Sequence, residues 1–173
     1  MKNHSPMYEL YAPAKLTLSL AITGVRESGL HELQAEMVTI DFQDTLRLRE
    51  GDTEVTYQGE YPIAPSSNDD LIVRALNAVG LSMKVEVDKK IPPGGGLGGG
   101  SANAAAILRW ANFKDEKKAV HLGSDVPFNI RGGRASVSGV GESVTYLPYE
   151  EKTFTLILPP FSCSTADVYK RWD

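Results

Sequence analysis

The chain has one cysteine, no long apolar run and no excess of basic residues. Its single cysteine among 173 residues, Cys163, excludes an intramolecular disulfide and fits a reducing compartment. No apolar run approaches the roughly 18 residues that span a bilayer, and the first residues, MKNHSPMYEL, have no signal-peptide core. The formal net charge of −4 argues against a nucleic-acid surface, which normally carries a basic excess. We therefore expect a cytoplasmic protein without nucleic-acid or membrane partners.

Glycine, in contrast, is concentrated in one place. Six of the seven positions from Gly94 to Gly100 are glycine, within the stretch IPPGGGLGGGSAN, and an alanine-rich segment follows. Glycine reaches positive φ without a steric penalty, so successive N–H groups can converge on an anion. The unpaired N–H groups at the start of the next helix add positive partial charge there. The tract favours phosphate binding over a structural turn or a linker, and the Ser101 hydroxyl could meet a phosphate-bound Mg²⁺.

Other nucleotide and metal signatures are weak or absent. Gly94-x-Gly96-x-x-Gly99 matches the dinucleotide fingerprint, but such a match is nearly automatic in a glycine run and no βαβ context precedes it. No Gly-Lys-Ser/Thr follows, so the tract is not a Walker A loop. The three histidines, His4, His31 and His121, have no metal-ligand spacing. We expect no metal site formed by protein ligands.

Apolar alternation and capping residues predict an α+β domain. The first strand, 14–22, alternates apolar Leu16, Leu18 and Leu20 with polar residues that include Lys15 and Thr17. The other expected strands are two short ones within 36–50, and single ones at 54–58, 82–88, 134–147 and 153–158. The expected helices are 71–80, capped by Asp69 or Asp70 and ended by Gly80, then 102–111 and a short charged helix at 115–123.

Five segments, in order, resemble the GHMP kinases: APAKLTLSLAITG, RESGLHELQ, IPPGGGLGGGSANAA, LGSDVPF and GVGE. Within that family they are most similar to the group acting on 4-diphosphocytidyl-2-C-methyl-D-erythritol in non-mevalonate isoprenoid biosynthesis. The resemblance runs from Ala12 to about Asp167 and implies ATP-dependent phosphorylation of the 2-hydroxyl group of that molecule. It also implies a GHMP kinase N-terminal domain (ribosomal protein S5 domain 2-like) over 1–158. Residues 159–173 would then begin a C-terminal domain that this chain lacks.

The resemblance also implies roles for individual residues. Asp125 falls on the catalytic base or acceptor-positioning aspartate, and Lys15 falls on the lysine that stabilises it and offsets phosphoryl charge. Thr17, Leu30 and His31 fall on positions that meet the acceptor substrate. The resemblance also implies which residues bind ATP: Pro93, Gly94, Gly95, Gly96, Leu97, Gly98, Gly99, Gly100, Ser101 and Asn103. Mg²⁺ would be held mainly by the phosphates of ATP. On the residues alone, Asp125 is more typical of a turn or helix cap and Lys15 of a solvated strand face.

Four positions depart from the family pattern. Thr17 and Asp70 replace asparagines, Ala102 replaces a serine, and Leu30 replaces the tyrosine on which cytosine stacks. Two alternatives therefore stay open: a GHMP kinase for homoserine or mevalonate, and a half-length, non-catalytic nucleotide-binding module. Without a C-terminal domain, an exposed inter-domain face would favour self-association as a homodimer.

Overall fold

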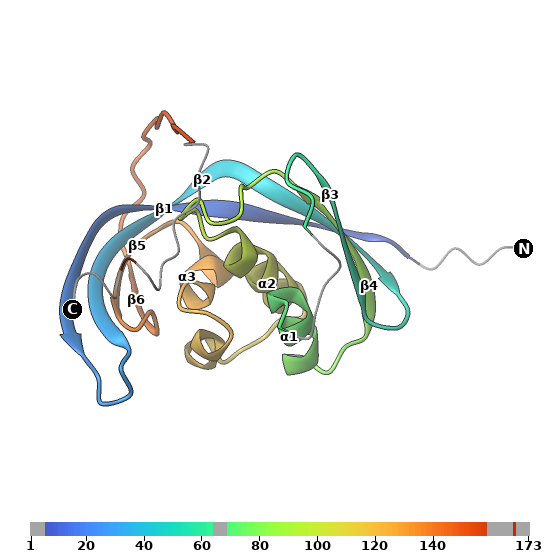
Figure 1. Ribbon diagram of the computed structural model, residues 1–173, viewed down its shortest axis with the longest axis horizontal. Helices are drawn as coiled ribbons and strands as arrows, with labels where there is room; N and C mark the ends of the chain where they lie inside the picture. Colours follow the sequence, from blue (N-terminus) through green and yellow to red (C-terminus); the bar gives the residue numbers. More distant parts are fainter. Residues whose placement is uncertain (1–5, 64–68, 159–167, 169–173) are drawn as a thin grey trace, which may run out of the picture.

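A curved mixed sheet with helices on its concave side makes up the described residues, 6–63, 69–158 and 168 of the computed structural model (Figure 1). The strands are β1 (Tyr8–Val25), β2 (His31–Glu50), β3 (Glu54–Gly59), β4 (Met83–Lys89), β5 (Arg134–Gly139) and β6 (Ser143–Tyr146). Their order is β3-β4-β2-β5-β6, with β1 paired along β2. β3 and β4 are parallel, while the other pairs described are antiparallel. The predicted α+β class is confirmed.

The helices are α1 (Leu71–Ala78), α2 (Gly99–Trp110) and α3 (Val126–Arg131), with a 3₁₀ helix, η1 (Glu116–His121). The predicted α1 is confirmed: the Asp70 side chain accepts the Ile72 N–H at 2.8 Å, and Gly80 follows the helix at φ +67°. α2 begins three residues earlier than predicted, because its first turn consists of the last loop glycines. The short helix expected at 115–123 is a 3₁₀ helix, and α3 was not predicted.

The longest strand, β2, corrects the expectation of two short strands within residues 36–50. It is a single strand of 20 residues. Along one edge it pairs first with β5, over Leu33–Val38, and then with β4, over Thr45–Glu50, while β1 runs along its other edge. Each half of β2 therefore has its own partners, which keeps the strand continuous without an intervening turn.

The alternation expected for β1 is also wrong in part. Leu18 and Leu20 are 36% and 51% exposed, whereas Lys15 is 8% exposed. The register with β2 shifts between Pro13 and Lys15 and again between Thr17 and Ser19. Each shift changes the face to which the following side chains point. Lys15 is therefore buried, and the reading of its strand face as solvated is incorrect at this position.

The strand expected at 134–147 is divided into β5 and β6 by a turn at residues 140–142, and the strand expected at 153–158 is not formed. No strand of the described sheet pairs with this second segment. The apolar side chains of this segment differ in burial: Leu156 packs against the cluster of Ala14, Ile91 and Leu97, while Ile157 is 87% exposed. Residues 64–68, and residues 159–173 apart from Val168, lie outside the described residues.

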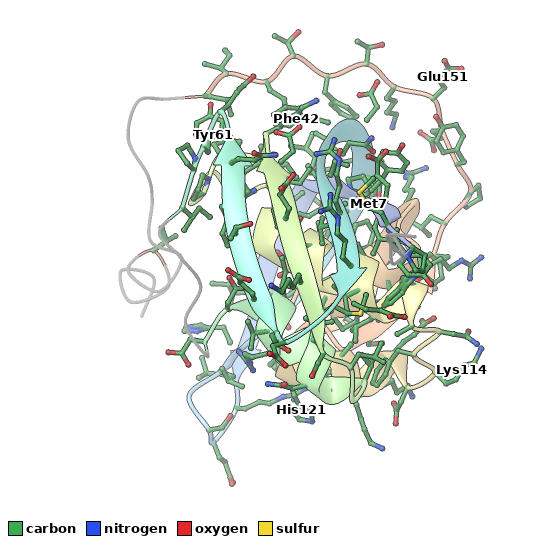
Figure 2. All side chains as sticks on the ribbon, turned by 90° about the vertical axis from the view of Figure 1, so that its right-hand side faces the viewer. Met7, Phe42, Tyr61, Lys114, His121 and Glu151 are labelled. Carbon is green, nitrogen blue, oxygen red and sulfur yellow. The ribbon has the colours of Figure 1, made fainter. Side chains whose placement is uncertain are left out.

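The main core lies between the sheet and the helices. It consists of apolar side chains from β2 and β4 against those from α1 and α2, including Leu46, Leu48, Val85, Val87, Ile72, Leu76, Ile107 and Leu108. In the view of Figure 2, Phe42 and Tyr61 lie toward the top of the molecule and His121 lies toward the bottom. Phe42 packs beside the cluster of Ile91 and Leu97, so the glycine-rich loop leaves the sheet far from His121.

Candidate active site

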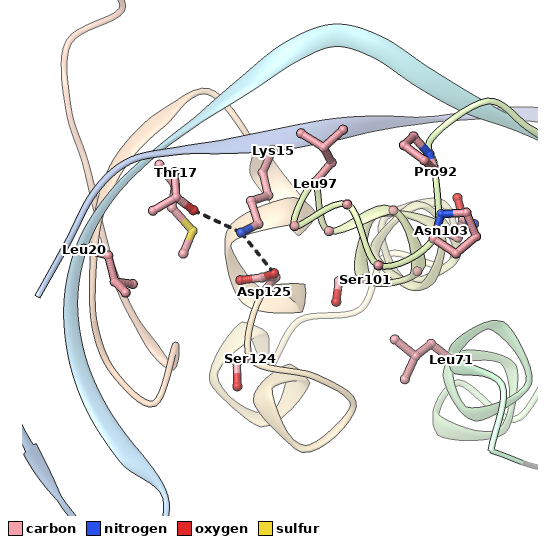
Figure 3. Close-up of a pocket in the computed structure, with 18 of the residues that line it drawn as sticks. Lys15, Thr17, Leu20, Leu71, Pro92, Leu97, Ser101, Asn103, Ser124 and Asp125 are labelled. Carbon is pink, nitrogen blue, oxygen red and sulfur yellow. Dashed lines mark hydrogen bonds and ion pairs between the residues drawn. The ribbon is translucent and has the colours of Figure 1, made fainter. Parts of the chain in front are cut away.

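A cavity of about 770 Å³ lies between the curved β1–β2 hairpin and the starts of α2 and α3 (Figure 3). Pockets of this size hold nucleotide-sized ligands. Every residue predicted for the site lines this cavity, from Lys15, Thr17, Leu30 and His31 through the whole loop 93–101 to Asn103 and Asp125. The structure therefore brings together the candidates from all these segments.

The glycine-rich loop is held close to β1. Gly94, Gly96 and Gly98 have φ values of +72°, +70° and +66°, and Leu97 between them is buried. The Leu97 carbonyl oxygen accepts the Lys15 N–H at 3.0 Å. A Cβ built on Gly98 would lie 2.9 Å from Lys15 Cγ and 3.3 Å from Asp125 Oδ2. Glycine at position 98 is therefore required both by the backbone conformation and by the close approach of Lys15.

The loop runs directly into the N-terminus of α2. The first amide in the helical ladder is that of Ala102, which donates to the Gly98 carbonyl oxygen at 2.8 Å. The N–H groups of Gly99, Gly100 and Ser101 precede it, so they have no partner within the helix. Together with the helix dipole they make this end of the cavity suitable for an anion. Buried Asn103 adds a side-chain oxygen, Oδ1, that has no hydrogen-bond partner among the described residues.

Lys15 and Asp125 form the charged centre of the cavity. Lys15 Nζ lies 3.5 Å from Asp125 Oδ2 and donates to Thr17 Oγ1 at 3.0 Å, as Figure 3 shows. Asp125 is at the N-cap position of α3, yet within the described residues its side chain makes no capping hydrogen bond. The carboxylate is directed to Lys15 instead, so the reading of Asp125 as a side-chain helix cap is not supported by the geometry.

A second, deeply buried ion pair lies beneath the loop, and it was not predicted. Lys89 Nζ donates to Asp44 Oδ2 and to the Ile91 carbonyl oxygen, both at 2.6 Å. Asp44 Oδ1 accepts the N–H groups of Lys90 and Ile91, both at 2.8 Å. Burial lowers the pKa of the Lys89 ammonium, although the Asp44 carboxylate acts in the opposite direction.

The Lys89 ammonium contacts both ends of the loop. It holds the Ile91 carbonyl oxygen where the chain enters the loop, and a Cβ on Gly99 would lie 2.8 Å from it where the chain leaves. The alternation of buried and exposed side chains along β2 and β4 could have indicated that Lys89 and Asp44 are buried. Lys89 continues the buried series of Val85 and Val87 in β4, and Asp44 lies on the same face of β2 as Leu46 and Leu48.

An apolar end of the cavity is lined by Tyr57, Ile63 and Leu71. The Tyr57 hydroxyl donates to Asp70 Oδ2 at 2.5 Å, while the other carboxylate oxygen caps α1. Burial, and then the hydrogen bond to Asp70, raise the pKa of the Tyr57 hydroxyl. Both Asp70 oxygens are therefore engaged within the protein.

The other end of the cavity is formed by the β1–β2 hairpin. Leu30 is 55% exposed in the connecting turn, and His31 begins β2 opposite Val25. Leu20 of β1 and Met37 of β2 line the wall between this turn and Lys15. Sequence reasoning missed these two side chains, because the register shifts in β1 are not apparent from alternation.

The described part of the chain has neither a membrane-spanning helix nor a cluster of metal-binding side chains. No helix there has the length and apolar character needed to cross a membrane. The same residues contain no group of three or more His, Cys, Asp or Glu side chains that could hold a metal ion.

The Lys15–Asp125 pair, the glycine-rich loop and the N-terminus of α2 line one cavity of this α+β domain. Residues 70–133 match the family model described as GHMP kinases N terminal domain. The 4-diphosphocytidyl-2-C-methyl-D-erythritol kinase of Clostridium beijerinckii is 33% identical over 95% of this chain and 65% of its own length. The enzyme of the same name from Heliobacterium modesticaldum is 38% identical over 93% and 57%, respectively.

Solved structures of kinases are also similar to this chain. A crystal structure of 4-(cytidine 5'-diphospho)-2C-methyl-D-erythritol kinase matches with a TM-score of 0.63 and 34% identity, over 81% of this chain and 55% of that one. Homoserine kinase from Cytophaga hutchinsonii, at 19% identity and a TM-score of 0.55 over 98% of this chain and 61% of its own, shares the fold. The chain belongs to the GHMP kinase family, and it spans 57–65% of the length of the two curated relatives above.

Proposed function

We propose that the chain is the ATP-binding part of a kinase for the 2-hydroxyl group of 4-diphosphocytidyl-2-C-methyl-D-erythritol, acting in non-mevalonate isoprenoid biosynthesis. One observation carries the proposal: the Lys15–Asp125 pair lies 3.5 Å apart directly beneath the glycine-rich loop, in a single cavity. Relatives of that name, similar over nearly the whole chain, supply the substrate class. Residues 1–158 form the ATP-binding domain in this proposal, and 159–173 begin a C-terminal domain.

The loop end of the cavity holds the phosphates of ATP. The backbone N–H groups of Gly99, Gly100 and Ser101 provide donors for the phosphates, and the missing side chain at Gly98 allows Lys15 to approach the loop closely. ATP supplies the phosphoryl group. Mg²⁺ would be held mainly by the phosphates of ATP, with the Ser101 hydroxyl as the protein group nearest to it, and would neutralise phosphate charge. Phosphoryl transfer depends chiefly on such positioning and charge neutralisation.

Asp125 and Lys15 act on the acceptor and on the developing charge. The Asp125 carboxylate accepts the proton of the acceptor hydroxyl as that oxygen forms its bond to phosphorus. The Lys15 ammonium, oriented by Thr17, neutralises charge on the phosphoryl oxygens. The products are ADP and a phosphate monoester of the acceptor, with the proton left on Asp125.

The hairpin end of the cavity receives the acceptor. Figure 3 shows Thr17 on the same side of the Lys15–Asp125 pair as Leu20, away from Leu71. Leu30 and His31 line the same cavity where the β1–β2 hairpin turns. The proposal places the cytidine part against Leu30 and His31, where Leu30 offers apolar contact without ring stacking. The single cysteine and acidic net charge support a cytoplasmic location without nucleic-acid or membrane partners. Exposed apolar side chains outside the cavity, such as Leu18 and Val25, support self-association as a homodimer.

An ADP-release assay with this chain and ATP tests the proposed function. We expect release to depend on 4-diphosphocytidyl-2-C-methyl-D-erythritol and to be lost in Asp125→Asn. Homoserine and mevalonate serve as competing acceptors. ADP release that depends on either of these instead would overturn the substrate, and ATP binding without release with any acceptor would overturn the activity of this chain.

A further inference from the structure

Two segments that carry the family resemblance have no role in the proposed chemistry, yet they meet in the structure. RESG (26–29) forms the turn of the β1–β2 hairpin, and GVGE (139–142) forms the turn between β5 and β6. Arg26 Nη2 donates to Glu142 Oε1 at 2.5 Å, across 116 positions of sequence, and Arg26 Nε donates to Glu32 Oε1 at 2.8 Å. One guanidinium group therefore joins the two turns.

The hairpin side of this contact is fixed to the acceptor end of the cavity. The Arg26 N–H donates to the Leu30 carbonyl oxygen at 2.9 Å, and the Gly29 N–H donates to the Arg26 carbonyl oxygen at 2.8 Å. Gly29, Leu30 and His31 all line the cavity. The backbone of Arg26 therefore holds the turn that presents these residues, while its side chain reaches outward to Glu142.

The other side of the contact packs closely against the segment that carries Asp125. Glu142 Oε2 accepts the Val140 N–H at 2.6 Å, which closes the turn. Gly141, at φ +111°, lies so close to Ser124 that a Cβ on Gly141 would overlap the Ser124 carbonyl oxygen. Ser124 directly precedes Asp125 on the segment drawn in Figure 3, and Val140 lines the same cavity.

We propose that Arg26 is a positioning residue that couples the acceptor-binding hairpin to Asp125 through Glu142 and the turn 139–142. The inference rests on the proposed function. The guanidinium fork makes two directional hydrogen bonds to carboxylates, which fixes the distance between the two turns. Because the side chains of Arg26 and Glu142 are 39% and 28% exposed, the pair adds little to stability. Its effect is on the placement of Asp125 relative to the acceptor.

Steady-state kinetics of Arg26→Met tests this role. A displacement of about 1 Å at a reacting group costs up to about 100-fold in rate, so we expect at least about a tenfold loss of kcat. The KM for the acceptor should rise, while the KM for ATP should stay within about twofold, because the loop end is held separately. A fall in kcat with both KM values unchanged, or a rise in the KM for ATP alone, would overturn the coupling.

Matched variants separate positioning from a general structural effect. Arg47 also bridges two carboxylates, Glu9 at 3.1 Å and Glu86 at 3.5 Å, with a similar 33% side-chain exposure but on no wall of the site cavity. Arg47→Met should leave kcat and both KM values unchanged. Glu142→Gln should reproduce the kinetic defect of Arg26→Met, and the double variant should be no worse than either single one. Additive losses would overturn the coupling.

Amide hydrogen exchange gives a readout that does not need activity. In Arg26→Met, exchange should accelerate in residues 28–31 and 122–126 and stay unchanged in the loop 94–101. Uniform acceleration, or no change in either segment, would overturn the inference. If the unmodified chain releases no ADP but this local pattern is found, the proposed function fails while the coupling stands. If the chain releases ADP but this local pattern is absent, the proposed function stands and the coupling fails.

Discussion

The two ends of the cavity are built from different parts of the protein. At the loop end, the cavity is lined mainly by glycine backbone, and the supporting Lys89 and Asp44 side chains are 3% and 0% exposed. At the hairpin end, side chains face the cavity, and Leu20 and Leu30 are more than half exposed. Backbone donors can bind phosphate only if the chain is held rigidly, which burial provides. Exposed side chains on a turn can be exchanged at little cost to the fold.

The largest expected effect falls between the two ends, at Asp125. Asp125→Asn removes the proton acceptor while keeping nearly the same shape, so kcat should fall by about 100-fold or more. ATP affinity should change little, because the loop is untouched. Asp115→Asn is the control, since Asp115 caps the remote η1 helix. ADP-release rates that are equal for the two variants would contradict the assigned role.

The ion pair beneath the loop should matter for folding more than the pair at the hairpin. Asp44→Asn leaves buried Lys89 without a counter-charge, and the free energy of unfolding should fall by about 3 kcal/mol. Arg26→Met should lower it by less than about 1 kcal/mol. Urea unfolding of both variants measures the difference. Equal losses would mean that the two ends are held in the same way.

Two glycines with the same conformation sharpen the comparison further. Gly98 and Gly80 have φ values of +66° and +67°, but within 4 Å only Gly98 has neighbours that a Cβ would meet. Alanine at either position should lower the free energy of unfolding by roughly 1–2 kcal/mol through backbone strain. ATP affinity, measured by calorimetry, should fall more than about tenfold in Gly98→Ala and stay unchanged in Gly80→Ala. A similar affinity loss in both variants would contradict the contact argument.

The smallest expected effect is the pH response of the hairpin end. Although its partial burial acts in the opposite direction, the hydrogen bond from Arg26 lowers the pKa of the Glu142 carboxyl below its ordinary 4.5. Its ionised form therefore stabilises the folded turn above the ordinary pKa, and this contribution is lost as pH falls through the lower folded value. The Val140 amide resonance should titrate with a midpoint below 4.5. A midpoint at or above that value would contradict the contact, and Glu142→Gln should show no such titration.

Local patterns predicted the loop end well. The cap at Asp70, the end of α1 near Gly80 and the alternation of β4 depend on residues a few positions apart. The same alternation places Lys89 and Asp44 on buried faces, so this pair could have been inferred from the sequence. The glycine tract was identified for the same reason, since its conformation follows from its own composition.

The hairpin end could not be predicted in the same way. The continuity of β2 depends on partners far away in sequence, and the register shifts in β1 have no local signal. The contact of Arg26 with Glu142 spans 116 positions. α3 is six residues long, and Pro127 in its first turn, although compatible with a helix start, gives little periodicity to detect.

An NMR titration of the chain with ATP tests the central claim most directly, because it follows the loop amides themselves. We predict that the largest shifts fall on the backbone N–H resonances of Gly98, Gly99, Gly100 and Ser101, with smaller shifts at the Lys15 amide. Saturation with ATP that leaves these resonances unchanged, or that moves another surface of the protein instead, would contradict the account.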